Sequence, residues 1–129
     1  MLHEIFKGMD NAAEQINENF QNGSIVESGN NENGFWARYG DGTQMCILER
    51  TETLSTTTSL SLFRGNLGNW EFPKAFLDEP YVDVSVAEGS VIGNTPFRLT
   101  AEDYTPRIYT IQQTNTSVNS RLIAIGRWK

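Results

Sequence analysis

Few side chains in this 129-residue chain are of the kinds that perform catalysis, and their spacing disfavours an active site. The carboxylate pairs Asp78–Glu79 and Glu102–Asp103 are candidates for the acid and base of glycoside hydrolysis, but adjacent side chains in loops usually diverge. The single histidine, His3, lies near the start of the chain, and the single cysteine, Cys46, is predicted to be a small core residue. No phosphate-binding loop or EF-hand spacing occurs. We therefore expect a non-enzymatic protein with no cofactor and no metal ion.

Aromatic rings beside polar side chains are a second chemical lead, because a ring face packs on the apolar face of a sugar while amides bind its hydroxyl groups. The candidate ligand-binding residues are two tyrosines and two asparagines near polar segments: Tyr104, Tyr109, Asn94 and Asn115. The competing interpretation, in which aromatic side chains fill the core, is favoured for three others: Trp36, Trp70 and Phe72.

Charge and composition limit the classes of partner. Ten basic and sixteen acidic residues give a net charge of -6, without a basic block, so we expect neither nucleic-acid binding nor attraction to an anionic membrane. No apolar run approaches the roughly 20 residues of a membrane span, and no segment is typical of a signal peptide. We therefore expect no membrane insertion. We also expect the protein to be made in a cytoplasm.

The first 22 residues have the periodicity of an amphipathic helix. Asp10 is a suitable N-cap, Asn22 and Gly23 suit a helix end, and the firm part is predicted from about Asp10 to Phe20. Apolar residues recur every three or four positions, and the candidate oligomerisation residues are Ile5, Met9, Ala12, Ile16 and Phe20. A helix of this length is unstable alone. We therefore expect it to pack either on its own domain or on other copies of the chain.

The helical period ends after this segment, and short strands separated by turns follow. Asp41–Gly42 predicts a two-residue hairpin turn in which Tyr39 faces Gln44 and Ala37 faces Cys46. Both faces of this hairpin are largely apolar, so we expect both to be covered.

Further strands are expected where apolar residues alternate. Residues 51–61 are predicted to be extended, 64–69 a loop, and 81–86 a strand with three valines on one face. Shorter strands are expected over 97–100, 107–113 and 120–128, the last two joined by a turn at 118–120. The prediction is a mainly β protein: a helix over 1–22, a linker over 23–33, and an antiparallel β-sandwich head, jelly-roll-like, over 34–129.

Three short segments resemble the receptor-binding head domains of tail-fibre and baseplate proteins of tailed bacteriophages of Gram-positive bacteria. The hairpin Gly34–Cys46, the segment Trp70–Val82 and the ending Ala124–Lys129 are similar to the opening hairpin, the next aromatic turn and the closing strand of those heads. Residues 12–20 are similar to the short N-terminal helices of baseplate proteins.

The resemblance implies a virion tail protein that forms a homotrimer, associates with other phage tail or baseplate proteins, and contacts carbohydrate of the host cell surface. It transfers no binding residue, because no pocket motif of the family is matched. The alternative from a different class is a saccharide-binding module of a bacterial surface protein.

Overall fold

The computed structural model of the protein describes residues 24–129. The predicted helix over 1–22, with its proposed oligomerisation residues Ile5, Met9, Ala12, Ile16 and Phe20, lies outside the described residues.

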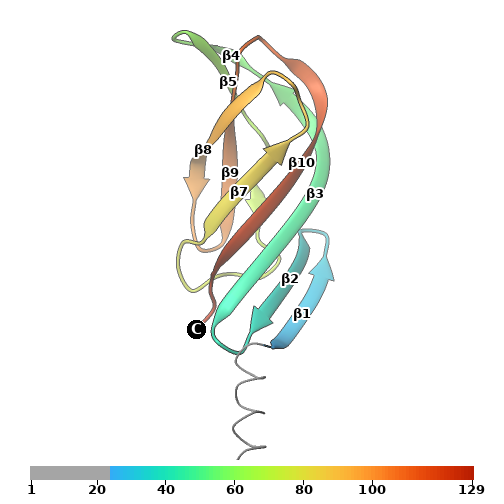
Figure 1. The fold of residues 1–129 in the computed structure, drawn as a ribbon, viewed down its shortest axis with the longest axis vertical. Helices are drawn as coiled ribbons and strands as arrows, with labels where there is room; N and C mark the ends of the chain where they lie inside the picture. Colours follow the sequence, from blue (N-terminus) through green and yellow to red (C-terminus); the bar gives the residue numbers. More distant parts are fainter. Residues whose placement is uncertain (1–23) are drawn as a thin grey trace, which may run out of the picture.

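Ten strands make up the described part of the chain, and no helix occurs within it (Figure 1). They are β1 (Ile25–Asn31), β2 (Gly34–Tyr39), β3 (Thr43–Ser55), β4 (Thr57–Ser59), β5 (Leu62–Asn66), β6 (Trp70–Glu71), β7 (Tyr81–Val86), β8 (Val91–Leu99), β9 (Asp103–Thr110) and β10 (Asn115–Arg127).

Two antiparallel sheets form the fold. The first sheet has the strand order β1-β2-β3-β10-β7, and its long central strands β3 and β10 pair along their whole length. In the second sheet β5 and β6 pair with β9 along one edge, β8 pairs with its other edge, and β4 extends the sheet beyond β5. Figure 1 shows β3 and β10 running along the length of the domain. The predicted mainly β antiparallel sandwich is confirmed.

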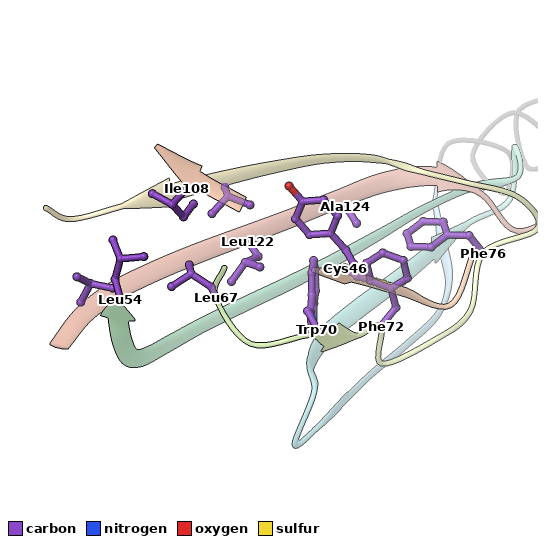
Figure 2. Packing of buried hydrophobic residues seen from close by; sticks show 12 residues of the cluster. Cys46, Leu54, Leu67, Trp70, Phe72, Phe76, Ile108, Leu122 and Ala124 are labelled. Atoms are coloured by element: carbon purple, nitrogen blue, oxygen red, sulfur yellow. The ribbon is translucent and has the colours of Figure 1, made fainter. Parts of the chain in front are cut away.

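The core lies between the two sheets, because alternate residues of each strand point inward. Cys46, Leu122 and Ala124 are fully buried from the first sheet, and Ile108 from the second. Figure 2 shows Trp70, Phe72 and Phe76 gathered toward one end and Leu54 and Ile108 toward the other. Trp70 and Phe72 meet edge to face at 4.9 Å. These two rings and Cys46 are core residues, as predicted, and Trp36 packs against the core while remaining partly exposed.

The predicted hairpin exists, but its register differs by one residue. Arg38 pairs with Gln44 and Trp36 with Cys46, where the expectation paired Ala37 with Cys46. The Gly42 N–H donates to the Tyr39 carbonyl at 3.0 Å, and Gly42 alone of the turn residues has a positive φ, +97°. The turn between β2 and β3 covers residues 40–42, and within it the Asp41 carboxylate accepts from the Thr43 N–H at 2.9 Å. Apolar residues still occupy both faces, because Phe35, Ala37, Met45 and Ile47 share the face opposite Cys46.

Three segments predicted to be irregular belong to strands. The proposed linker over 23–33 contains β1, which pairs with β2, and the proposed loop over 64–69 begins inside β5. The expected turn at 118–120 lies within β10, where Val118 is buried, and the connection from β9 covers 111–114 instead. The strand expected over 97–100 is the end of the longer β8. Polar side chains on the exposed face of each strand produced these errors.

Candidate functional site

The four predicted ligand-binding residues occupy separate places. Tyr104 faces the core with 2% of its surface exposed, and burial, followed by the nearby Asp83 charge, raises the pKa of its phenol. Its ring is therefore not available as a stacking surface. Asn94 pairs with the core residue Ile108 and donates to the Val84 carbonyl at 3.3 Å, whereas Asn115 begins β10. Tyr109 lies on the outer face of the second sheet, so the structure does not bring the four together.

The outer face of the first sheet carries two rows of apolar side chains. The strand register aligns Phe35, Ile47 and Ile123 in one row, which ends at Asp83 on β7, and it aligns Ala37, Met45, Ile125 and Tyr81 in the next. We call the seven apolar residues of these rows the apolar face. Tyr81 is 88% exposed, Ile125 46% and Phe35 39%. Contiguous apolar patches on a protein surface mark interaction sites, unlike scattered single residues.

A polar hollow adjoins the apolar face along the same strands. It has a volume of about 480 Å³ and is lined by residues of β3, β7 and β10 and of the turn after β7. Arg121 Nε donates to Glu49 Oε1 at 2.8 Å, and Thr51 Oγ1 donates to Asn119 Oδ1 at 2.6 Å. These two contacts pair four of the polar side chains that line the hollow with one another.

The outer face of the second sheet is polar and basic around Tyr109. Its six residues, which we call the Tyr109 face, come from three strands: Arg64, Asn66, Thr95, Phe97, Arg107 and Tyr109. The Arg107 guanidinium lies 4.8 Å from the centroid of the Phe97 ring. Hydrogen bonding to Thr95, then to Arg107 and Arg64, lowers the pKa of the Tyr109 phenol.

Tyr109 was found from the sequence, but its charged neighbours were not. Arg107 precedes it by two residues on β9, so alternation alone places both on one face. Arg64 reaches Tyr109 through pairing of β5 with β9, which joins segments 45 residues apart. No local pattern reveals such a contact, because residues 64–69 have the composition of a loop.

The part of the chain that the structure describes shows neither a cluster of metal ligands nor a membrane-spanning helix. Within residues 24–129 no three histidine, cysteine or carboxylate side chains gather as a metal site would require. No helix of these residues is long and apolar enough to cross a membrane.

No protein-family model matches the sequence, and no curated protein matches it. Solved structures do resemble its fold. A C-terminal part of the P. aeruginosa R1 pyocin fibre aligns with a TM-score of 0.53 at 14% identity over 80% of this chain, and this chain spans 29% of that one. An N-truncated R1-type pyocin tail fibre aligns with a TM-score of 0.52 at 13% identity, covering 80% of this chain and 88% of the other. The tailspike protein gp49 of Pseudomonas phage LKA1 aligns less well, with a TM-score of 0.45 at 15% identity, over 66% of this chain and 15% of that one.

These identities establish similarity of fold alone. The pyocin fibre is a Pseudomonas protein, so the resemblance to proteins of phages of Gram-positive bacteria finds no support in these structures. The described residues of this chain share the fold of a domain found in a pyocin tail fibre.

Proposed function

We propose that the protein is a non-enzymatic part of a phage-type tail, located at the tail tip or baseplate of a virion, that takes part in adsorption to a host surface. The observation that carries this proposal is the apolar face, present on a fold shared with pyocin tail fibres. On this proposal the chain forms a homotrimer and associates with other tail or baseplate proteins.

Two properties favour a second copy of the chain as the cover for the apolar face. First, the seven side chains of the apolar face are uncharged, and Asp83 stands at the β7 end of one row, so copies that each carry a net charge of -6 can meet over the apolar side chains with this carboxylate at the edge. Second, burial of apolar surface contributes roughly 25 cal/mol per Å², so the exposed members of the apolar face, above all Tyr81, Ile125 and Phe35, provide a driving force, whereas Ala37 is already buried within the chain. Association about a rotation axis then uses the same patch on each subunit.

The first test is the mass in solution by light scattering. We expect about three times the 14.5 kDa of one chain. Ile125→Glu places a charge within the apolar face and should give monomers. Ile111→Glu is the matched control, because Ile111 is 62% exposed in the connection between β9 and β10. A monomer at high micromolar concentration in the parent protein would contradict the proposal.

The second test concerns the predicted helix. Removing residues 1–22 should weaken the trimer if the apolar stripe of that segment packs between copies. If the truncated protein is a trimer of unchanged stability, the segment has no part in assembly. If it aggregates where the parent is a monomer, residues 1–22 cover the apolar face within one chain.

A second candidate function is favoured by the Tyr109 face: a saccharide-binding module of a bacterial surface protein, active as a monomer. Binding to cell-wall glycans that is independent of oligomeric state would support it. Tyr109→Ala should then reduce binding without unfolding the domain. Tyr104→Ala is not a usable binding test, because removing a buried ring costs about 3–5 kcal/mol of stability.

A further inference from the structure

We propose that the Tyr109 face binds an acidic saccharide: Arg64 and Arg107 hold its carboxylate or phosphate group, and the Tyr109 ring packs on the sugar. The inference rests on the proposed adsorption role and names the class of ligand. Asn66 Oδ1 accepts from Arg107 Nε at 3.5 Å, so the amide N–H groups of Asn66 are left to bind sugar hydroxyl groups.

The strand register brings these side chains within reach of one sugar unit. Tyr109 pairs directly with Arg64 on β5, and Arg107 pairs with Asn66 on β5 and with Thr95 on β8. Side chains of directly paired residues have Cβ atoms about 5 Å apart, and alternate residues on a strand are about 7 Å apart. Both guanidinium groups therefore extend from positions that flank one ring.

The opposite side of Tyr109 is open. Its partner on β8 is Gly93, and a Cβ atom built at Gly93 would meet nothing within 4 Å. A sugar ring can thus lie beside the tyrosine where other sheet positions carry a side chain. The backbone at Gly93 has an ordinary φ, so larger residues fit there without strain.

Charge favours an anion at this place. Among residues 24–129, neither Arg64 nor Arg107 has a carboxylate within 4.0 Å, although the whole chain is acidic. Arg98 on β8 is neutralised by Asp103 at 3.0 Å. Asp103 is six residues from Tyr109 along β9, about 20 Å, beyond the roughly 8 Å screening length of physiological salt. Arg107 Nε donates to Asn66 Oδ1 at 3.5 Å, a neutral partner that leaves its charge uncompensated. Two arginines without a carboxylate partner suit a carboxylate or a phosphate, which guanidinium groups bind in bidentate fashion.

A saccharide fits this face better than other anions do. Two arginines are few for nucleic acid, whose binding depends on many phosphate contacts. An aromatic face, an amide and a hydroxyl group match the mixed apolar and polar surface of a sugar. The second sheet also faces away from the apolar face, so its outer surface stays accessible when copies associate through the first sheet.

The test uses the full chain and measures the dissociation constants of two probes by calorimetry: oligogalacturonate, which carries carboxylates, and phosphomannan oligosaccharide, which carries phosphates. At least one should bind the parent protein, and methyl-esterified oligogalacturonate should bind more weakly. Arg64→Gln/Arg107→Gln should weaken binding tenfold or more, since each charge-assisted hydrogen bond lost has an effect of that size. Tyr109→Ala and Gly93→Val, which fills the open side, should also weaken it.

The control is Arg121→Gln/Arg127→Gln, which removes the same charge from residues outside the Tyr109 face. An equal loss in this control would overturn the inference, because it would reflect net charge alone. Binding of poly-glutamate as tight as that of the acidic saccharides would also overturn it, and so would absence of binding by both probes. If the parent trimer adsorbs to cells and the Arg64/Arg107 variant adsorbs equally, only the ligand site is wrong. If the parent neither assembles nor adsorbs, the proposed function itself fails.

Discussion

Leu60 has an unusual backbone conformation for its residue type. It occupies the turn between β4 and β5 with φ +55°, and its side chain is 99% exposed. A left-handed conformation costs a branched residue roughly 1–2 kcal/mol, and nothing is gained from burial at this position. Sequence analysis placed Leu60 in an extended segment with Leu54, of which only Leu54 is buried.

We expect Leu60→Asn to raise the free energy of unfolding by about 1 kcal/mol, because asparagine tolerates the left-handed region. Urea denaturation measures the change. Leu77→Asn is the control, since Leu77 is 64% exposed and has no positive φ. A destabilised Leu60→Asn protein would mean that the leucine side chain makes a contact in an assembly.

Cys46 is the one thiol of the chain, and it is fully buried. Burial raises the pKa of this thiol from 9.0 to about 11. Because the pKa of the thiol is higher in the folded chain than in the unfolded chain, the buried neutral thiol contributes stability at pH values below the unfolded pKa. This contribution is lost as pH rises from about 9 through about 11. At pH 8 the folded protein should react with thiol reagents only through unfolding.

Ellman's reagent at pH 8 tests this expectation. The parent protein should react slowly, and its rate should rise in parallel with the unfolded fraction as urea is added. Cys46→Ala should lose less stability than the parent between pH 9 and 11. Rapid reaction without denaturant would show that the hairpin opens locally.

At the scale of elements, buried hydroxyl groups join β9 to the ends of β3 and β10. Thr56 follows β3, and its hydroxyl accepts from the Thr114 N–H at 2.8 Å, while its own N–H donates to the Thr114 carbonyl at 2.8 Å. Thr110 Oγ1 lies 3.3 Å from the same hydroxyl, and Ser90 Oγ lies 3.1 Å from Thr114 Oγ1. This cluster satisfies the backbone where the chain passes between the sheets.

Thr56→Val should destabilise the fold by about 1–3 kcal/mol, because it leaves the buried Thr114 N–H without an acceptor. Thr56→Ser keeps the acceptor and should cost clearly less. Denaturant unfolding of both variants measures the difference. A loss in Thr56→Ser as large as that in Thr56→Val would contradict the expectation, because serine keeps the acceptor and lacks only the methyl group.

Elements with regular alternation could be predicted from the sequence, and the others could not. In β7 the three valines share one face and Tyr81 lies on the other, as predicted, and the structure shows that the valine face is the inner one. In β8 the register is irregular beside Gly93 and beside Pro96, so the strand lacks a regular alternation and only its end was predicted. The hairpin was predicted, but its turn has three residues and carries an Asp41 carboxylate bond to the Thr43 N–H, a side-chain contact that composition does not indicate. Similarly, the ligand candidate Tyr109 was found and its partner Arg64 was not.

At the scale of the whole molecule, the two outer faces of the sandwich differ in chemistry. The first sheet presents the apolar face, and the second presents the Tyr109 face with two arginines that have no carboxylate within 4.0 Å. On the proposed function, the apolar face meets neighbouring subunits and the Tyr109 face meets the host. Because the two sheets lie back to back, the proposed assembly and the proposed binding do not compete for the same residues.

Assembly through the apolar face makes thermal stability depend on concentration. For a trimer that dissociates on unfolding, each tenfold rise in protein concentration stabilises each chain by about 0.9 kcal/mol. For a domain of this size that corresponds to a rise of roughly 3 °C in Tm. Calorimetry over a hundredfold range of concentration should show this rise for the parent and for Ile111→Glu, but not for Ile125→Glu. A Tm independent of concentration in the parent would mean that each chain covers its own apolar face, and the homotrimer would then have no physical support.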